Sequence, residues 1–542
     1  MKKAMKKLMA ALLAVAMVCA MAIPVFADNT EEDLNKLHGY IAFQIFKGVI
    51  SKDNQTLFDV DWGKNIPHPE DFLEKLKDAP IIGAQFQSIN ATDATNATTV
   101  QKVLAVISQW SNSDDDSIAF ARFVCNYIYT DPLADSESTI VGGNGAIKIP
   151  EPGYYLIVDN TYFNLRDFYH AYNSFFLVNV PQAGPQGYNV TIHHKVVKPT
   201  VKKKVFDNFD NQDGSSTGDF GSSADHAINE EFQFKLIATL PASRDNGRAY
   251  DYYDEYAVLF NDTLSEGITY DGLDSVVIES KGIPYDITGD SSKYEVDDSR
   301  LESDHYLVVG IPDVKACGAG LNLNDGATIT VTYTAHLNEK AAVNGSADNQ
   351  NRVRLQYSNN PRNSAYWGFT PESEVRVYTY QLNNTKYHDD DIPGNELAGA
   401  GFSLYSDEHC TQEVKLYKEG NFYFPIKDAT GKTAVEMTSD DKGQFNVKGL
   451  DAGTYYLKET TPPTGYSACD KTKIVISATH DEHNVNLSGE SNLNNKIINK
   501  KAGGITLPST GGIGTTLFYV VGGGLMVAAI VLLVTKKRME NH

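Results

Sequence analysis

Cysteine is scarce in this chain of 542 residues, which has five cysteines in all. Only Cys125, Cys317, Cys410 and Cys469 follow the first 27 residues, and they are widely scattered. Small disulfide-stapled folds need many closely spaced cysteines, so that class is excluded. Cys410 and Cys469 form a candidate pair, and four free or buried thiols are an equally consistent interpretation.

Basic residues are outnumbered, with 47 Lys and Arg against 69 Asp and Glu and a formal net charge of −22. This balance argues against nucleic acid as a partner. A phosphate-binding glycine loop and a Ser-His-Asp triad are also lacking. His480 and His483 lie in a polar turn, where solvated side chains are expected rather than metal ligands. We therefore expect no metal and no cofactor.

The N-terminal residues 1–27 have the pattern of a secretory signal peptide. Four lysines precede an apolar run over 8–23, and the small residue Ala27 closes a cleavage site. A retained N-terminal membrane anchor is the alternative. Pro24 interrupts the apolar run, which favours cleavage near Asp28.

The C-terminal residues combine three features in a fixed order. Leu-Pro-Ser-Thr-Gly at 507–511 precedes an apolar stretch over 517–534 and then a basic tail. The apolar stretch approaches the ~20 residues of a membrane-spanning helix, and the tail is a cytoplasmic stop. The alternative is an ordinary membrane helix that follows an accidental pentapeptide. The arrangement resembles an LPXTG sorting signal, in which a sortase cleaves between Thr510 and Gly511.

The length and the turn pattern predict several β domains in series. Short alternating apolar runs are separated by Gly, Asn, Asp and Pro, as in β-sandwiches. We expect an all-β protein of tandem Ig-like, Cna-type sandwiches, the N-terminal one with helical insertions. The expected regions are a signal peptide at 1–27, domains at 28–195, 196–374 and 375–500, and a linker with the sorting signal, membrane segment and basic tail at 501–542.

The first domain has mixed patterning. Strands are predicted at 39–48 and 153–158, and the apolar spacing over 101–128 predicts a helical segment. Gly-Tyr-Tyr-Leu-Ile-Val-Asp at 153–159 echoes Gly-Thr-Tyr-Tyr-Leu-Lys-Glu at 453–459. This echo indicates a shared Ig-like plan or a chance likeness of Gly-aromatic strands.

In the second domain, three polar residues fall on apolar strand faces. Residues i and i+2 of a strand share a face. Lys203 therefore shares a face with Val201 and Val205, Asp262 with Val258, Phe260 and Leu264, and Asn351 with Val353, Leu355 and Tyr357. Buried charged residues are rare unless they are paired.

The third domain repeats this arrangement. Lys386 shares a face with Tyr380 and Leu382, Glu459 with Tyr455 and Leu457, and Asn499 with Ile497. Burial lowers the pKa of a lysine and raises that of a carboxyl, so the amine becomes a nucleophile and the acid a proton shuttle. Each set can form a Lys–Asn isopeptide bond. The alternative is a buried ion pair with Asn as a neighbour, and two similar sets favour the bond.

Lys195 is predicted to lie on a polar, outward strand face, unlike Lys203 and Lys386. Val190 and Ile192 share one side of a predicted strand, so Lys195 is expected to be exposed at the junction of two domains. Such a residue suits attachment to another molecule. On spacing alone, a solvated basic linker over 195–204 explains it better.

These features together resemble a Gram-positive backbone pilin of the SpaH/EbpB type. The resemblance rests on Gly-Tyr-Ile-Ala-Phe-Gln-Ile-Phe-Lys-Gly at 39–48, Asp-Thr-Leu-Ser at 262–265, Leu-Ala-Gly-Ala-Gly-Phe-Ser-Leu-Tyr at 397–405 and Tyr-Tyr-Leu-Lys-Glu at 455–459. It implies an N-terminal pilin domain, a fimbrial isopeptide domain and a Cna-B-type domain. It also implies Lys203–Asn351 and Lys386–Asn499 crosslinks, catalysed by Asp262 and Glu459.

The pilin motif of that family maps to Val-Thr-Ile-His-His-Lys at 190–195, which implies Lys195 as the sortase-linked lysine. His193 and His194 depart from the motif, so Lys198 competes for the role. Asp159 occupies the position of Glu459 in the first domain, but we find no lysine partner and expect no crosslink there.

The expected function is a structural pilus subunit on the cell wall, joined through Thr510 to a lysine of the next copy. Its expected partners are pilin-class and housekeeping sortases, other copies of itself, accessory pilins and peptidoglycan. It is not expected to be an enzyme beyond a single self-crosslinking turnover. A monomeric wall-anchored adhesin is the alternative, and a surface hydrolase ranks last. The sequence names no host ligand.

Overall fold

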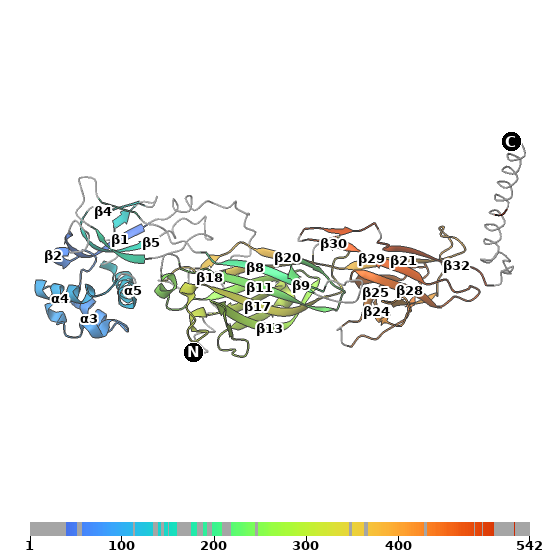
Figure 1. The fold of residues 1–542 in the computed structure, drawn as a ribbon, viewed down its shortest axis with the longest axis horizontal. Helices are drawn as coiled ribbons and strands as arrows, with labels where there is room; N and C mark the ends of the chain where they lie inside the picture. The colour runs from blue at the N-terminus through green and yellow to red at the C-terminus, as the bar shows by residue number, and fades with distance from the viewer. Residues whose placement is uncertain are drawn as a thin grey trace, which may run out of the picture.

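The computed structural model describes residues 40–50, 57–111, 114–133, 139–141, 146–149, 151–159, 175–180, 188–191, 198–208, 218–243, 248–345, 349–361, 367–427, 431–481, 483–489, 491–502 and 525. These residues form three units in a row along one long axis (Figure 1). The blue unit is the first, the green and yellow unit is the second, and the orange unit is the third. The signal peptide and the sorting signal that the sequence predicts lie outside the described residues.

One sheet and three helices make up most of the described first unit. The sheet contains β1 (Tyr40–Ile50), β2 (Leu57–Trp62), β3 (Thr139–Val141), β5 (Gly153–Asp159) and β6 (Phe175–Val180), and β4 (Ala146–Ile149) pairs with β7 (Tyr188–Thr191). The helices are α3 (Pro69–Lys77), α4 (Ala97–Ile107) and α5 (Asp115–Thr130). Phe43, Phe46, Phe72 and Phe120 are fully buried in one core cluster that joins sheet and helices. The predicted helical insertions are confirmed.

The single helical segment predicted over 101–128 is wrong in one respect, because two helices occupy this region. The side chains of Asn96 and Asp114 accept hydrogen bonds from the backbone N–H groups of Thr98 and Ser117, at 2.9 and 2.8 Å. Residues of this type at this position begin helices. The cap at Asp114 therefore starts a new helix where the apolar spacing alone suggested continuation.

The second unit is a sandwich of two sheets. One sheet has the order β14-β13-β17-β11-β8-β9 and the other β10-β20-β18-β12-β16-β15, with β19 on β18. The first consists of β8 (Thr200–Asp207), β9 (Asp219–Gly221), β11 (Glu231–Leu240), β13 (Ile268–Ser280), β14 (Ile283–Asp286) and β17 (Ala327–Leu337). The second consists of β10 (Ser223–Asp225), β12 (Val258–Leu264), β15 (Glu295–Arg300), β16 (Tyr306–Ile311), β18 (Gln350–Ser358), β19 (Trp367–Phe369) and β20 (Ser373–Tyr378). The short helix α7 (Leu301–Asp304) follows β15.

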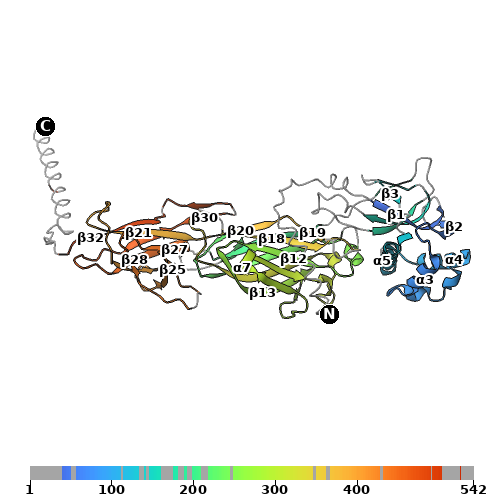
Figure 2. The same ribbon diagram turned by 180° about the vertical axis from the view of Figure 1, so that it is seen from behind.

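The sandwich is long and closely packed because its central strands alternate strictly. Side chains of β11 and β17 that face inward are buried, from Phe232 to Leu240 and from Ala327 to Leu337. Figure 1 labels β8, β11, β17 and β13 on one side of the unit, and Figure 2 labels β12, β18 and β19 from behind. The inward faces of both sheets share one core cluster.

The third unit is a smaller sandwich. Its sheets have the orders β24-β25-β27-β21-β32 and β23-β22-β28-β29, with β26 on β22, and β30 pairs with β31. The strands are β21 (Tyr380–His388), β22 (Gly401–Tyr405), β23 (Glu413–Val414), β24 (Leu416–Glu419), β25 (Phe422–Pro425), β26 (Met437–Thr438), β27 (Asn446–Leu450), β28 (Gly453–Thr461), β29 (Thr472–Ile476), β30 (Ala478–His480), β31 (Val485–Leu487) and β32 (Asn494–Asn499). The first and last strands, β21 and β32, run parallel as neighbours.

The echo between 153–159 and 453–459 corresponds to one local structure. Gly153 and Gly453 begin β5 and β28 with φ of 152° and 150°, a region that favours glycine. Two residues later, the hydroxyls of Tyr155 and Tyr455 donate to the carbonyls of Glu151 and Asp451, each at 3.0 Å. The shared sequence pattern therefore specifies the same strand-entry turn in both units.

The junction of the second and third units lies slightly later than the sequence suggested. The expected boundary at 374 falls within β20, which pairs with β18 of the second sandwich. The third unit begins after Tyr378, at β21.

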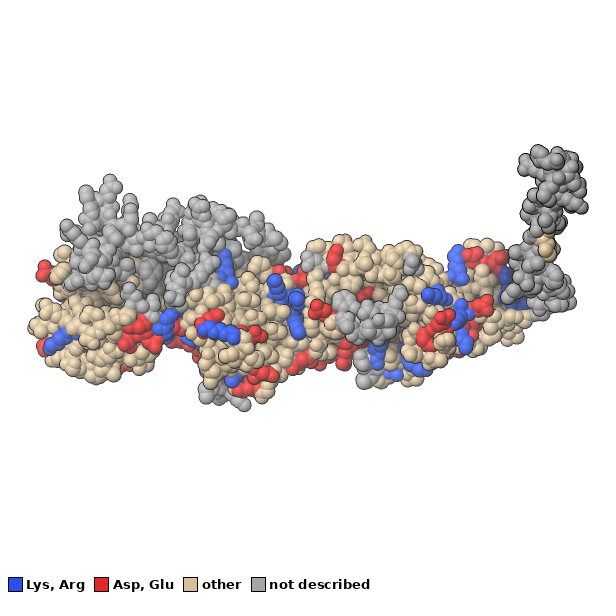
Figure 3. Space-filling view, viewed as in Figure 1, with Lys and Arg blue, Asp and Glu red and all other residues tan. Residues whose placement is uncertain are grey.

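Within the described part of the chain, none of the helices has the length and hydropathy of a membrane span. On the face shown in Figure 3, acidic and basic side chains are interspersed along the molecule.

Candidate functional site

Lys203 and Asp262 meet in the centre of the second sandwich. Lys203 lies on β8 of one sheet and Asp262 on β12 of the facing sheet, and both side chains are fully buried. The Lys203 ammonium nitrogen lies 2.5 and 2.6 Å from the two carboxylate oxygens of Asp262. The strand-face argument placed both residues inside, and this burial is confirmed.

Tyr333 on β17 completes this site and was not recognised from the sequence. Its hydroxyl donates to an oxygen of Asp262 at 2.7 Å and accepts from Lys203 Nζ at 3.1 Å and from Asn351 Nδ2 at 2.6 Å. One hydroxyl thus contacts all three predicted residues. The available signal was its position, because a tyrosine on an aliphatic strand face needs a buried partner for its hydroxyl.

Asn351 on β18 lies at the same site with no exposed surface. Its Oδ1 is buried and has no hydrogen-bond partner among the described residues. A buried carbonyl oxygen without a donor is costly in free energy, so such atoms are uncommon. A protonated Asp262 carboxyl in the same cluster would be a donor for this oxygen, and such a bond would polarise the carbonyl.

Burial shifts the ionisation of the pair in opposite directions. Desolvation lowers the pKa of Lys203 from 10.5 to about 8. Desolvation also raises the pKa of Asp262, against the opposing attraction of Lys203. The two shifts bring the pKa of Lys203 and the pKa of Asp262 closer together. Proton transfer from the ammonium to the carboxylate therefore costs less free energy. The product of that transfer is a neutral amine beside a protonated acid.

The third sandwich holds a second cluster of the same composition. Lys386 on β21, Glu459 on β28 and Asn499 on β32 are all buried. Lys386 Nζ donates to Asn499 Oδ1, and Asn499 Nδ2 donates to Glu459 at 2.8 Å. The Lys386 nitrogen lies 3.5 Å from a Glu459 oxygen. The predicted set is thus brought together by the parallel pairing of the first and last strands.

Lys386 occupies an environment similar to that of Lys203. Desolvation lowers the pKa of Lys386, and this effect exceeds the opposing influence of Cys469 and Glu459. Its ammonium lies 5.4 Å from the Phe402 ring centroid, and that of Lys203 lies 5.1 Å from the Phe234 ring centroid. Aromatic faces stabilise a cation where water is excluded. Each lysine is therefore held in place by a ring as well as by its polar partners.

Cys469 contacts the third-domain cluster and was not predicted to do so. Its sulfur lies 3.6 Å from Lys386 Nζ, and its backbone N–H donates to Glu459 at 2.8 Å. Burial raises the pKa of this thiol. The four cysteines in the described residues are free, so the candidate pair of Cys410 and Cys469 is not a disulfide in this structure.

The predicted sortase residues lie mostly outside the described part of the chain. Lys195, Thr510 and Gly511 are in segments that the structure does not describe. Lys198 is described, precedes β8 and is half-buried. The structure therefore tests neither Lys195 nor Lys198 as the linked lysine.

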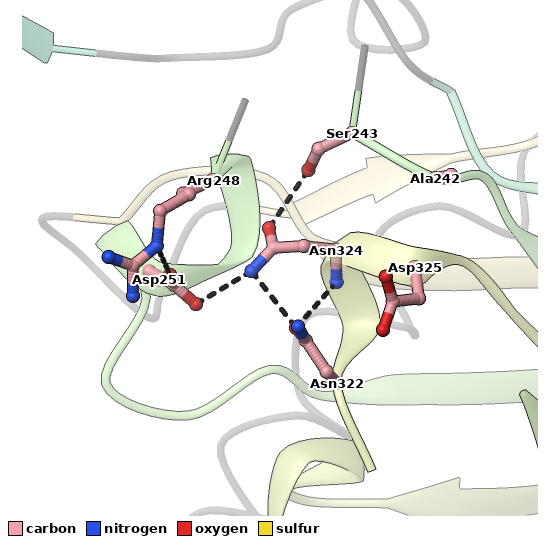
Figure 4. Close-up of a pocket in the computed structure, with 7 residues that line it drawn as sticks. All are labelled: Ala242, Ser243, Arg248, Asp251, Asn322, Asn324 and Asp325. Atoms are coloured by element: carbon pink, nitrogen blue, oxygen red, sulfur yellow. Dashed lines mark hydrogen bonds and ion pairs between the residues drawn. The ribbon is translucent and has the colours of Figure 1, made fainter. Parts of the chain in front are cut away.

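A polar hollow in the second unit is lined by Ser243, Arg248, Asp251 and Asn324, among others (Figure 4). Its lining groups bond to one another: Asn324 donates to Asp251 at 2.8 Å and accepts from Ser243 at 2.9 Å. Arg248 bonds Asp251 from the same hollow and Asp115 of α5. These contacts join the first two units, and they present no nucleophile beside a base.

His480 differs from its expected solvated state. Its side chain is 13% exposed, and its Nδ1 lies 2.9 Å from the Ser223 hydroxyl of the second unit. Carboxylates of Asp207 and Asp225 lie 3.5 Å from Nε2. His483 is exposed, as expected. His480 thus contacts the second sandwich from the third, because it ends β30, and the hairpin of β30 and β31 lies against the second unit.

Two family models match the C-terminal part of the chain. Residues 383–492 match the SpaA domain, described as a prealbumin-like fold, and residues 499–541 match the LPXTG cell wall anchor motif. The trypsin-resistant surface T6 protein of Streptococcus pyogenes serotype M6 is 24% identical over 413 residues, which cover 65% of this chain and 71% of that protein. The C-terminal part of the chain thus contains a SpaA domain followed by an LPXTG cell wall anchor motif.

Solved structures of pilins align along most of the chain. The T6 backbone pilin of Streptococcus pyogenes is 14% identical, with 86% of this chain and 96% of that chain covered and a TM-score of 0.44. The full-length major pilin SpaD of Corynebacterium diphtheriae is 17% identical, with 86% and 93% covered and a TM-score of 0.41. These TM-scores are below 0.5, so the functional conclusions rest on the sequence matches alone.

The anchor match makes this chain a cell-wall-anchored protein of a Gram-positive surface. Its anchor motif implies processing by sortase and linkage to peptidoglycan. The SpaA match contains Lys386 and Glu459, and Asn499 is the first residue of the anchor match. The third-domain cluster thus spans the boundary between the two matched regions.

Proposed function

We propose that this chain is a subunit of a pilus backbone, that it forms two internal Lys–Asn isopeptide bonds, and that a sortase polymerises it through Thr510 and a lysine beside β8. The observation that supports the internal bonds most strongly is the buried Lys203–Asp262–Asn351 cluster, in which the Asn351 carbonyl oxygen has no donor among the residues that the structure describes. The second cluster repeats the chemistry with Glu459 in place of Asp262.

The reaction at the first cluster needs no external reagent. A proton moves from the Lys203 ammonium to the Asp262 carboxylate, and the neutral amine attacks Cγ of Asn351. The new N–Cγ bond forms as the Cγ–Nδ2 bond breaks, and the old amide nitrogen leaves as ammonia. Asp262 gives its proton to the leaving nitrogen and takes the second proton that the Lys203 nitrogen loses, so the acid is protonated at the end. Fixed proximity in the core provides much of the rate.

The internal bonds suit a subunit under tension. The Lys203–Asn351 bond closes a loop of roughly 150 residues, which by the chain-entropy model is worth on the order of 5 kcal/mol. The Lys386–Asn499 bond joins the neighbouring strands β21 and β32, which are the first and last of their sandwich. Tension that enters at β21 passes directly to β32, and the strands between them bear none of it.

The path of tension through the subunit explains why no crosslink is expected in the first unit. If the preceding subunit is attached at Lys195, tension runs from Lys195 through the second and third sandwiches to Thr510. Residues before Lys195 then lie outside the path of force. A crosslink would bring no mechanical benefit in the first unit, which agrees with the lack of a lysine partner for Asp159 in the sequence.

The joint between subunits is tested on the native cell surface. Wild-type cells should show a ladder of detergent-resistant polymers, and Thr510→Ala should remove it. Lys195→Ala should also remove it, whereas Lys202→Ala, at an exposed position on β8, is the matched control and should leave it intact. If the ladder persists in Lys195→Ala and is lost in Lys198→Ala, the linked lysine is Lys198. A ladder that survives both changes together contradicts the proposal.

A further inference from the structure

A buried turn of the second sandwich inserts against the third. The turn over residues 226–230 connects β10 to β11, and the backbone N–H of Ile228 donates to the carbonyl of Gly449 at 2.9 Å. A Cβ atom at Gly449 would lie 2.5 Å from the side chain of Ile228. The two sandwiches are therefore in close contact at this point.

His226 in this turn has a fixed tautomer. Its ring stacks on Phe232 at a centroid distance of 4.2 Å, and its Nε2 lies 2.7 Å from the carbonyl oxygen of Phe206. A carbonyl only accepts hydrogen bonds, so Nε2 holds a proton, and the lone pair of the neutral ring is then on Nδ1. Nδ1 is buried and has no hydrogen-bond partner in the described chain.

Two carboxylates lie beside this imidazole. One ring nitrogen of His226 and an oxygen from each of Glu230 and Asp451 lie within 4.8 Å of one another. Asp451 follows β27 of the third sandwich, so the group spans the junction. The Asn208 amide lies 3.2 Å from Glu230 and 3.3 Å from Asp451, and the Lys427 ammonium lies 3.3 Å from Glu230.

We propose that His226, Glu230 and Asp451 bind a divalent transition-metal ion of the Zn²⁺ class, which clamps the second sandwich to the third. An imidazole nitrogen with two carboxylate oxygens is a donor set that zinc accepts, with water in the fourth position. The bond from Nε2–H to a backbone carbonyl is the outer-shell contact that orients metal-binding histidines. Calcium prefers oxygen ligands only, so the imidazole disfavours it.

The neighbouring group of Asp207, Asp225 and His480 is a weaker candidate and a good internal control. It also lies at the junction, and its ligand atoms are similarly close. Both ring nitrogens of His480 already face polar partners, with Ser223 at Nδ1 and the two carboxylates at Nε2. His480→Gln should therefore leave zinc binding unchanged.

Isothermal titration of Zn²⁺ into the chelator-treated full-length protein in detergent tests the site. Wild type should bind one Zn²⁺ per chain, and Glu230→Gln and Asp451→Asn, which keep side-chain shape, should each weaken binding about tenfold or more. His226→Phe keeps the stacked ring and should abolish binding.

X-ray absorption of the zinc-loaded wild type should show nitrogen and oxygen ligands that include an imidazole. Absence of binding in the wild type would overturn the proposal. So would binding that survives all three substitutions, binding that is lost in His480→Gln, or a preference for Ca²⁺ over Zn²⁺. Each variant is also checked for folding by its thermal transition, so that loss of binding is not confused with loss of structure.

Discussion

Lys203 and Asp262 lie 2.5 Å apart in the interior of the second sandwich, and neither side chain has any exposed surface. An ion pair in such a place has lost its hydration, and that cost often exceeds the attraction between the charges. Conversion of the lysine to an amide leaves a neutral bond and a protonated acid. The proposed isopeptide bond would thus remove the buried charges of Lys203 and Asp262 from this core.

Asp262→Asn should leave the second sandwich without its crosslink. The amide cannot take a proton from Lys203, so the lysine remains charged and poorly nucleophilic. Loss of the bond should lower the free energy of unfolding by on the order of 5 kcal/mol. At about 2–4 °C per kcal/mol for a domain of this size, the melting temperature should fall by about 10–20 °C.

Asp274→Asn is the matched control for this change, because Asp274 is an exposed acid of the same sandwich. It should keep the crosslink and the melting temperature of the wild type. An Asp262→Asn protein with the crosslink intact, judged by tryptic peptides that join residues 203 and 351, would show that Asp262 is not the proton carrier.

Glu459→Gln should remove only the third-domain crosslink. Glu459 lies 3.5 Å from Lys386 and 2.8 Å from Asn499 Nδ2, and it is the acid within the cluster. Linked peptides around Lys386 and Asn499 should disappear from a digest, and those around Lys203 should remain. Glu408→Gln, at an exposed position, should change neither. Loss of both crosslinks in Glu459→Gln would mean that the two sites do not act independently.

Tyr333→Phe should slow the second-domain reaction without abolishing it. The hydroxyl holds Asp262, Lys203 and Asn351 in one arrangement, and misplacement of reacting groups costs on the order of tenfold to a hundredfold in rate. The time course of ammonia loss after refolding measures this rate by mass spectrometry. Tyr270→Phe, in the ring that packs 5.5 Å from Tyr333, is the control. Equal rates in the two variants would rule out a positioning role for the Tyr333 hydroxyl.

Asn351→Ala should make folding stability depend on pH in the alkaline range. The bond cannot form, so Lys203 keeps an amine whose pKa burial lowers from 10.5 to about 8. Between these values the unfolded chain binds more protons than the folded one, so stability should rise as pH increases from 8 to 10.5. Thermal melts across this range, compared with the wild type, measure the effect. A wild type with the same rise would indicate that its Lys203 is also a free amine.

Much of both clusters could be predicted from the sequence because strand alternation assigns each residue to a face. Lys203, Asp262 and Asn351 stand at even spacing from aliphatic neighbours, and all three are buried as that spacing requires. Lys386, Glu459 and Asn499 follow the same rule. A period of two is a strong constraint wherever one side of a sheet is packed.

The missed contacts depend on distances between strands that are remote in sequence. Tyr333 and Cys469 approach their clusters from strands or turns whose alternation gives no hint of what lies opposite. The expected solvated turn at His480 is wrong for the same reason, since His480 ends β30 and is covered by the second unit rather than by its own. Asp114 is an N-cap residue, which marks the start of α5 in the sequence. The apolar spacing continues on both sides of it, so the spacing alone predicts one helix instead of two.

The intact mass of the secreted protein tests the central claim most directly. Each isopeptide bond releases one ammonia, or about 17 Da, so the account predicts a mass about 34 Da below the sequence sum. Asp262→Asn and Glu459→Gln should each restore about 17 Da of that difference. A wild-type mass equal to the sequence sum would contradict the account, because the two buried clusters would then be ion pairs and nothing more.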